Sequence, residues 1–584
     1  MLTPSPSVSG IPAYATGPHP APCDLDLAGS AATDVAAVSF GNALADAQAR
    51  SSRYPDVRPL TDRIAARFGV PAERVLVTAG ADEALERACR AVLSRGKNAI
   101  VTDPTFEMLS RYVVLSGGEL RQVQWPRGEF PVEAIVAASD DRTALVAVVT
   151  PNNPTGAVAA LADIRRLHDA LPAALLVLDC AYVEFADDDL TAAALALPRV
   201  LVARTLSKAW QLPGIRIGYA LGAPEVISWM RVAGGPYSVS SPSVALAEAA
   251  LDGDGAAREA AIARIRTNRS RLEAILRELG EDVTPSQASF VCVAGARARW
   301  LRDALAGFGI AARLLGTPER LRITVPADDV AFSRVERAIR TALRPEAILF
   351  DMDGVLADVS QSYREAMRLT AAAFGVTVTA DEIRARKAGG NANNDWIVTT
   401  AMVNAAGVPA TLESITTTFE QVYQGDGGTP GLRETERLIV PREWIAALAA
   451  RYPLAIVTGR PRADAYRFLD RFGLRELFRA VVTLDDGPLK PDPHPVVAAM
   501  RALQVSRAWM IGDTPDNVAS ARAAGALPIG VIPPGEPVSG AFSSATPPPG
   551  TEALANDGSL TGALYGAGAA RVFDTSTGIS TCLP

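Results

Sequence analysis

Lys208 lies in a stretch, residues 205–219, where hydroxyls, an amine and a guanidinium follow one another closely. It is one of only four lysines among 57 basic residues, so lysine stands here where the chain otherwise uses arginine. An amine can lose its proton and form a Schiff base with an aldehyde, whereas a guanidinium cannot. The neighbouring Ser207 and Arg216 suit a phosphate group. The stretch therefore predicts a pyridoxal 5'-phosphate (PLP) site, although a surface lysine on a loop after a strand fits the same residues equally well.

A second chemical group is the pair Asp351 and Asp353, directly after the apolar run 347–350. At the end of a buried strand, two such carboxylates point the same way. One can attack a phosphoryl group while the other protonates the leaving oxygen. A pair of solvated turn aspartates would explain the two residues alone, but polar clusters also follow the apolar runs 454–457 and 508–511.

The first half of the chain alternates apolar runs with helical patterns. The runs are 75–78, 98–102, 144–150, 175–178 and 200–203, and each ends in a polar cluster. Continuous apolar strands of this kind predict a mostly parallel sheet that is covered on both faces. Ligands of such sheets bind beyond the carboxyl ends of the strands. A helix near 258–279 and a smaller α/β unit with strands near Phe290 and Leu321 should follow.

In the second half, about a hundred residues between Asp358 and Thr458 have helical patterns at 362–373, 412–423 and 434–450. Within them, residues 389–396 form a polar loop with an aromatic side chain. We hypothesise that this loop contacts the leaving group of a substrate, although a surface turn fits nearly as well. Residues 533–550 should form a loop, and 554–574 should complete the second fold.

The totals restrict the class of protein. A chain of 584 residues exceeds the size of a single core, so two or three domains are expected. We expect no membrane segment, secretory signal or nucleic-acid partner, because the chain lacks long apolar and basic runs and its net charge is -7. Five cysteines without CxxC spacing favour a reducing compartment. We therefore expect a cytoplasmic enzyme or binding protein.

Residues 20–343 resemble the PLP-dependent aminotransferases of fold type I, and within them the histidinol-phosphate aminotransferase family. The matching pieces are, in order, RYPD, GADEAL, PTFEM, PNNPTG, DCAYVEF, TLSKAWQLPGIRIGY, PYSVS and LRITV. The resemblance implies an N-terminal arm over 1–30, an aminotransferase domain over 31–344 and a homodimer. One element differs, because the family's Asn-Glu-Asn-Pro is here Leu-Ala-Gly-Ser-Ala at 27–31. The contacts of the arm with substrate, and so the substrate itself, stay open.

The same resemblance implies a role for individual residues. Lys208 would be the Schiff-base lysine, Asp179 the partner of the pyridinium nitrogen, and Arg322 the ligand of an anionic group of the substrate. The other implied contacts are with the cofactor: Tyr54 (from the neighbouring subunit), Ala81, Asp82, Phe106, Asn153, Tyr182, Ser207 and Arg216.

Residues 347–580 resemble the haloacid dehalogenase-like (HAD) phosphatases, so we expect a hydrolase domain over 345–584 with a helical cap at about 360–450. The resemblance implies Asp351 as nucleophile, Asp353 as acid/base, and Thr458 and Lys490 as phosphoryl ligands. Mg²⁺ would be bound by Asp351, the Asp353 carbonyl and Asp513, supported by Asp516 or Asn517. Dehalogenases of this superfamily lack the second aspartate, so Asp353 favours a phosphatase.

Together, the two resemblances imply a bifunctional enzyme that acts on a small phosphorylated ketone or amine with an amino donor such as glutamate. In histidine synthesis, imidazole acetol phosphate is transaminated and histidinol phosphate is then dephosphorylated. Two alternatives remain. The same chemistries could serve another phosphorylated metabolite in specialised metabolism. Otherwise, a weakly active HAD scaffold could accompany an aminotransferase or a decarboxylase.

Overall fold

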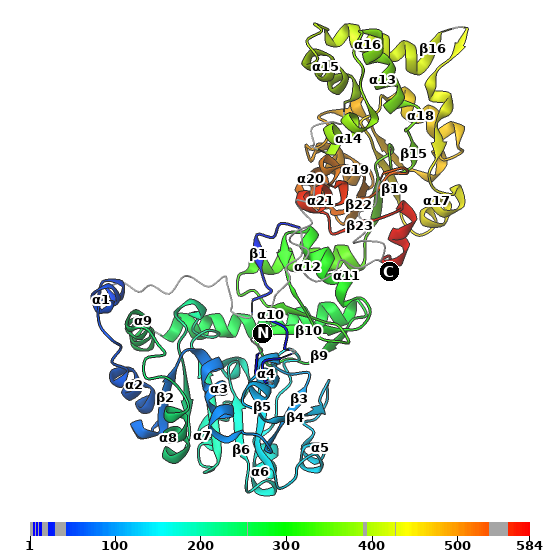
Figure 1. The fold of residues 1–584 in the computed structure, drawn as a ribbon. Coiled ribbons are helices and arrows are strands. Elements are labelled where there is room, and N and C mark those ends of the chain that lie inside the picture. Colours follow the sequence, from blue (N-terminus) through cyan, green and yellow to red (C-terminus); the bar gives the residue numbers. More distant parts are fainter. Residues whose placement is uncertain are drawn as a thin grey trace. The chain divides into compact units, whose positions relative to one another are not determined.

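The computed structural model describes residues 4–5, 7–9, 11–13, 21–29, 42–253, 255–388, 394–426, 428–536 and 559–584. Contacts divide the chain into two compact units, whose helices and strands are labelled in Figure 1. The first consists mainly of Asp26–Arg299 and Ala312–Ser333, and the second mainly of Trp300–Ala311 and Arg334–Pro584.

A seven-stranded sheet forms the centre of the first unit, in the order β2-β8-β7-β6-β5-β3-β4. Its strands are β2 (Val75–Thr78), β3 (Asn98–Asp103), β4 (Glu119–Gln124), β5 (Thr143–Val149), β6 (Leu175–Asp179), β7 (Val200–Thr205) and β8 (Gly218–Leu221). Within this sheet β8 is antiparallel to both neighbours, while β7, β6, β5, β3 and β4 are parallel. The mostly parallel sheet that the apolar runs predict is confirmed.

Helices α3 (Gly80–Val92), α4 (Glu107–Leu115) and α8 (Pro224–Val232) contribute to a core cluster with β3, β5, β6 and β7. A smaller antiparallel sheet in the same unit has the order β12-β13-β10-β9. Its strands are β9 (Asp282–Thr284), β10 (Phe290–Ala294), β12 (Arg313–Leu315) and β13 (Arg320–Thr324), and α10 (Gly255–Glu278) precedes them. The register places Arg313 directly opposite Arg322.

The second unit contains a six-stranded parallel sheet in the order β20-β19-β14-β21-β22-β23. Its strands are β14 (Ala347–Phe350), β19 (Leu454–Val457), β20 (Ala480–Val482), β21 (Ala508–Gly512), β22 (Leu527–Val531) and β23 (Arg571–Phe573). Apolar residues of β14, β19 and β21 pack with those of α19 (His494–Ala502) in one core cluster. Because β14 lies between β19 and β21, the motifs that follow these three strands meet at one edge.

The cap helices are α13 (Tyr363–Ala373), α14 (Ala380–Ala388), α15 (Asp395–Ala405) and α16 (Leu412–Gln424). They lie between two short strands, β15 (Ala357–Asp358) and β18 (Arg437–Leu438), which pair with each other. The predicted helix over 434–450 is therefore wrong in its first half. Its helical part, α17 (Arg442–Ala449), begins after Pro441, because proline holds the residue before it in an extended conformation.

Among the segments before residue 345 that cluster with the second unit are most of α11 (Ala298–Gly307) and most of α12 (Asp329–Leu343). The rings of Trp300 and Trp509 lie 5.0 Å apart, and the buried Asp303 accepts a hydrogen bond of 2.9 Å from Arg571 Nε. The core of the second unit thus includes residues 300–311, which lie outside the hydrolase segment 345–584 expected from the sequence.

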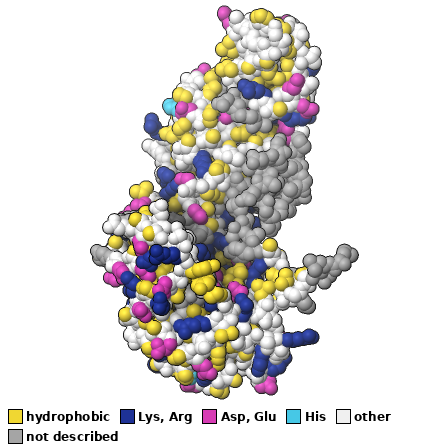
Figure 2. All heavy atoms as spheres, turned by 60° about the vertical axis from the view of Figure 1, so that its left-hand side comes forward, with side chains coloured by type: hydrophobic (Ala, Val, Ile, Leu, Met, Phe, Trp, Pro, Cys, Tyr) yellow, Lys and Arg dark blue, Asp and Glu magenta, His cyan; other side chains and the backbone are white. Residues whose placement is uncertain are grey.

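On the face of the molecule in Figure 2, acidic and basic side chains are interspersed among uncharged ones. This mixture agrees with totals of 57 Lys and Arg against 64 Asp and Glu. Among the helices that the structure describes, none has the length and apolar character needed to cross a membrane.

Candidate active sites

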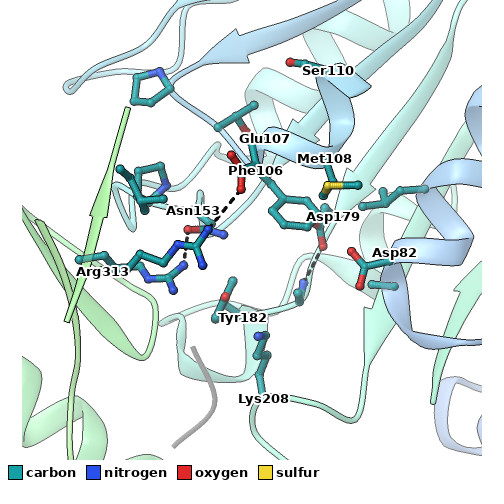
Figure 3. A pocket seen from close by; sticks show the side chains of 18 of the residues that line it. Asp82, Phe106, Glu107, Met108, Ser110, Asn153, Asp179, Tyr182, Lys208 and Arg313 are labelled. Carbon is teal, nitrogen blue, oxygen red and sulfur yellow. Dashed lines mark hydrogen bonds and ion pairs between the residues drawn. The ribbon is translucent and has the colours of Figure 1, made fainter. Parts of the chain in front are cut away.

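A cavity of about 740 Å³ opens at the carboxyl edge of the large sheet. Four of its lining residues follow different strands: Phe106 after β3, Asn153 after β5, Asp179 at the end of β6 and Lys208 after β7. Figure 3 shows these side chains around one space. The strand-end motifs, which are far apart in the sequence, therefore meet where parallel sheets bind their ligands.

Asp179 and Lys208 provide the cavity's central charges. Burial raises the pKa of the Asp179 carboxyl to about 7, while the amide of Ala181 and the charge of Lys208 oppose this rise. A carboxylate that is only 5% exposed calls for a cationic partner, which a protonated ring nitrogen can supply. Lys208 Nζ lies 5.4 Å from the centre of the Tyr182 ring, so amine and phenol face the same space.

An anion cradle lies beside these charges, where α3 begins. Ala81 and Asp82 line the cavity there together with Ser207 and Arg216, and Arg216 Nη2 lies 3.1 Å from Asp82 Oδ2. Strand β8 passes so close to this helix start that a Cβ at Gly218 would lie 2.4 Å from the carbonyl carbon of Gly80. Free N–H groups at a helix start, a hydroxyl and a guanidinium are the groups that bind phosphate.

The opposite end of the cavity is rich in arginine. Arg322, only 5% exposed, donates to Asn153 Oδ1 at 2.8 Å and to the Ala28 carbonyl at 2.7 Å. Arg313 reaches Glu107 Oε1 at 3.3 Å, as the dashed line in Figure 3 marks. The sequence singled out Arg322 and missed Arg313, Arg320 and Glu107. The alternation of residues along β13, which puts Arg320 and Arg322 on one face, is a signal that could have found Arg320.

Tyr54 is not among the residues that line this cavity. Its side chain is 78% exposed and stacks on Tyr237 with ring centres 4.5 Å apart. The contact with a neighbouring subunit that the sequence implies therefore stays a prediction.

The residues around this cavity fit PLP. A lysine amine, a buried carboxylate, an anion cradle and the aromatic Phe106 all reach one cavity. When bound, PLP stabilises negative charge at the α-carbon of an attached amine, because its ring accepts electrons. Asp179 would hold the ring nitrogen, and Ala81, Asp82, Ser207 and Arg216 would hold the phosphate. Arg322 and Arg313 are then left for the substrate.

The second site lies in the other unit, at the end of β14. Lys490 Nζ lies 2.9 Å from Asp351 Oδ2 and donates to the Val457 carbonyl at 3.0 Å. The Met352 amide donates to Asp351 Oδ1 at 2.7 Å. Asp351, Thr458 and Lys490 are all buried, at 5%, 3% and 4% exposure. The structure thus brings the expected nucleophile, at the end of β14, together with Lys490 from the segment before α19, and Thr458 directly follows the neighbouring strand β19.

Asp513 follows β21 and faces Asp351. Burial and the Asp351 carboxylate raise the pKa of Asp513. Gly354, with φ of +73°, permits this approach, because a Cβ there would lie 2.0 Å from Asp513 Oδ2. Of the two residues expected to support the metal, Asn517 donates to Asp513 Oδ1 at 3.3 Å.

This arrangement fits Mg²⁺, because two facing buried carboxylates are hard oxygen ligands that a cation would compensate. The expected set also contains one backbone carbonyl, that of Asp353. No cluster of three His, Cys, Asp or Glu side chains suited to a metal occurs in the part of the chain that the structure describes. Asp351, Asp513 and the Asp353 carbonyl would hold the ion, which polarises phosphoryl oxygens when bound.

Of the polar loop 389–396, residues 389–393 lie outside the described residues. Asn394 caps α15 by accepting from the Ile397 amide at 3.1 Å. Asp395 pairs with Lys387 at 2.8 Å. The proposed contact of this loop with a leaving group stays a hypothesis.

Comparison with known families assigns the two sites to two different enzyme families. Residues 26–338 match the family described as aminotransferase class I and II. Residues 345–525 match the haloacid dehalogenase-like hydrolase family. Both families consist of enzymes with the folds that the two sheets show.

Three relatives illustrate the range of similarity. An aromatic amino acid aminotransferase of Mycobacteroides abscessus is 35% identical over 57% of this chain and 98% of its own length. A histidinol-phosphate aminotransferase of Pectobacterium atrosepticum is 38% identical over 41% of this chain and 70% of its own. An imidazoleglycerol-phosphate dehydratase of Phytophthora nicotianae is 47% identical over 197 residues, 32% of this chain. This chain spans only 44% of the length of that dehydratase.

Among solved structures, the histidinol-phosphate aminotransferase from Sinorhizobium meliloti in complex with pyridoxal-5'-phosphate is similar to this chain. It is 26% identical, with a TM-score of 0.51, over 55% of this chain and 92% of its own.

Proposed function

Because the chain belongs to the class I and II aminotransferases and carries a HAD-like hydrolase domain, we propose that it performs two reactions on one phosphorylated metabolite. The first transfers an amino group from a donor such as glutamate to a small phosphorylated ketone. The second removes the phosphate from the resulting amine. The observation that carries the proposal is the pairing, in one chain, of an arginine-rich PLP-type cavity with a lysine-paired Asp351.

In the first reaction, Lys208 is the residue that moves a proton. Its amine lies near the Tyr182 ring and interacts electrostatically with Asp179. It can therefore take the proton from the substrate's α-carbon and deliver it to another atom of the bound substrate and cofactor. Asp179 stays ionised when it faces a cation, and its burial gives that ion pair a low-dielectric setting.

Arg322 and Arg313 select anionic substrates. The two guanidinium groups come from paired strands and face the same cavity. A planar guanidinium binds carboxylate or phosphate with two parallel hydrogen bonds. A donor carboxylate and a substrate phosphate can therefore bind in turn at the same end. We also propose that two chains form a homodimer in which Tyr54 completes the neighbouring cavity.

In the second reaction, Asp351 attacks the phosphoryl group while Lys490 and Thr458 hold its oxygens. Asp353 gives a proton to the leaving alcohol and then takes one from water. Asp351 and Asp353 follow β14, and Thr458 directly follows the adjacent strand β19, whereas Lys490 comes from the segment between β20 and α19.

For the substrate, we propose histidinol phosphate as the product of the first reaction. Two relatives support this choice, since their names specify histidinol phosphate and imidazoleglycerol phosphate. The second candidate is transamination of an aromatic amino acid, which the aromatic aminotransferase relative favours. Transamination of an aromatic amino acid would require neither the hydrolase residues nor Arg313 as a ligand for phosphate.

The test is to incubate the purified chain with PLP, Mg²⁺, glutamate and imidazole acetol phosphate, and to measure 2-oxoglutarate and phosphate. The proposal expects both products, with phosphate appearing after 2-oxoglutarate. Phenylpyruvate in place of the phosphorylated ketone should give at least about tenfold less 2-oxoglutarate, because a carboxylate carries less charge than a phosphate toward two arginines. Faster turnover of phenylpyruvate, without phosphate release from either phosphorylated compound, would favour the second candidate.

A further inference from the structure

Arg460 is a charged residue held in the interior of the second unit. It follows β19 by three residues and is 1% exposed. Its guanidinium carbon lies 4.9 Å from the ring centre of Tyr363 and 5.3 Å from that of Phe468. These aromatic faces fix the plane of the guanidinium, so its N–H groups can point in only a few directions.

Two carboxylates bind this guanidinium from different sides. Arg460 Nε and Nη2 approach Asp353 Oδ1 at 2.7 and 2.6 Å. Arg460 Nη1 donates to Glu436 Oε2 at 3.0 Å. Both contacts with Asp353 fall on one oxygen, Oδ1, so Oδ2 is the oxygen with which Asp353 can meet a leaving group.

Glu436 connects Arg460 to the cap. Its second oxygen, Oε1, accepts from Tyr423 Oη at 3.0 Å and from Ser362 Oγ at 3.1 Å. Ser362 directly precedes α13, and Glu436 directly precedes β18. The paired strands β15 and β18 are the two connections between cap and sheet, so this cluster sits where the cap joins the sheet.

Stability alone does not account for such a group. Removing charges from water costs several kcal/mol for each ion, and apolar residues of similar volume are often as stable or more stable. The burial of Arg460 between two acids is therefore better explained by the side chains that it orients than by a gain in stability. Its nearest catalytic neighbour is Asp353.

We propose that Arg460 is a positioning residue for Asp353, and that Glu436 makes this position depend on the cap. The inference rests on the proposed phosphatase reaction. In the first step Asp351 forms a bond to phosphorus, the bond from phosphorus to the leaving oxygen breaks, and Asp353 Oδ2 gives that oxygen a proton. In the second step water oxygen bonds to phosphorus, the Asp351 bond breaks, and Asp353 Oδ2 takes the water proton. Arg460 binds Oδ1 throughout and keeps Oδ2 directed at the reacting oxygens.

The test compares two phosphate esters with Arg460→Lys and Glu436→Gln in the full chain with Mg²⁺. An alkyl phosphate needs a proton for its leaving alkoxide, whereas p-nitrophenyl phosphate releases a stable anion and does not. The value of kcat/KM reports the first step, in which the leaving group departs. We expect each variant to lower kcat/KM for the alkyl phosphate about 10- to 100-fold, part of the 10²–10⁴ that a positioned acid contributes. The value for p-nitrophenyl phosphate should change by less than about threefold.

Arg475→Lys is the matched control, because Arg475 pairs with Asp470 on the surface of the same unit and the two side chains are 53% and 51% exposed. It should leave both substrates within about twofold of wild type, while Asp353→Asn should show the selective loss in full. Glu436→Gln keeps the test decisive if Arg460→Lys does not fold. Equal losses for both esters in the folded variants, or no loss, would overturn the positioning role. If wild type hydrolyses neither ester, the proposed phosphatase fails, and this inference fails with it.

Discussion

Replacing Arg322 by lysine tests how the first cavity recognises anionic substrates. Arg322 is 5% exposed, and its guanidinium is held by two hydrogen bonds of 2.8 and 2.7 Å, to Asn153 and Ala28. Lysine keeps the positive charge but cannot form two parallel bonds to a carboxylate or phosphate. A hydrogen bond to a charged group contributes about 1.5–3 kcal/mol, which corresponds to about 10- to 150-fold. We therefore expect Arg322→Lys to lower kcat/KM by that factor for glutamate and for the phosphorylated amine.

Arg313→Lys provides the contrast. Its ion pair with Glu107 is longer, at 3.3 Å, and the two side chains are 19% and 47% exposed. The Arg313 guanidinium is thus already shared with Glu107 and partly solvated, and lysine keeps its charge, so a contact with substrate there should contribute about 0–1 kcal/mol and the expected loss of kcat/KM is no more than about fivefold.

The assay is the half-reaction in which the enzyme is rapidly mixed with a single amine substrate. Its rate is measured from the change in the visible absorbance of the bound cofactor. The cofactor content of each variant is measured first, so that lost PLP is not mistaken for lost substrate binding. Arg127→Lys, at a side chain that is 71% exposed, is the control and should match wild type. An Arg322→Lys variant with full cofactor content and unchanged kcat/KM would refute this reasoning about anion recognition.

Three further predictions concern the same unit. Lys208→Ala should abolish covalent retention of PLP and reduce transamination by several orders of magnitude. Cofactor still attached to the borohydride-reduced variant, detected by mass spectrometry, would contradict this prediction. Light scattering should find a dimer, and Tyr54→Ala should weaken PLP binding in it; a fully active monomer would contradict the shared site. In cofactor-free protein, Asp179, with its pKa raised from 3.8 to about 7, should contribute stability that is present below pH 4 and lost as pH rises through 7. The upper limit is about 4 kcal/mol, and Asp179→Asn should flatten this part of the profile of unfolding free energy against pH.

Sequence patterns predicted the parts of the fold that depend on local order. Continuous apolar runs identified the strands that end at Asp179 and just before Asp351, and also the strands that pair with them. Because the strands of a parallel sheet end at the same edge, the polar motifs that follow them were expected to lie close together. The helix expected at 434–450 failed in its first half, where Pro441 was a local signal against it and a tertiary contact also opposed it. Residues 437–438 pair with 357–358, a contact that joins segments about 80 residues apart and that no local pattern reveals.

Several of the side chains that the sequence missed act through a partner far away in the chain. Arg313 meets Glu107 across 206 positions, and Arg460 meets Asp353 across 107. Arg460 is visible in the sequence beside Thr458, but its burial and its second partner, Glu436, arise only from packing. Motifs therefore located the reacting groups, while the residues that orient them required the structure.

The measurement that tests the two-reaction proposal most directly is product analysis with Asp351→Asn. An amide supplies neither the charge nor the nucleophile for attack on phosphorus, so phosphate release should fall by several orders of magnitude. Transamination should be nearly unchanged, because Asp351 belongs to a separate cluster beside Lys490.

Supplied with imidazole acetol phosphate and glutamate, wild type should accumulate the free amino alcohol, and Asp351→Asn should accumulate its phosphate ester. Phosphate release by the variant at the wild-type rate would contradict the assignment of Asp351. Failure of wild type to form either amine would contradict the proposed function as a whole.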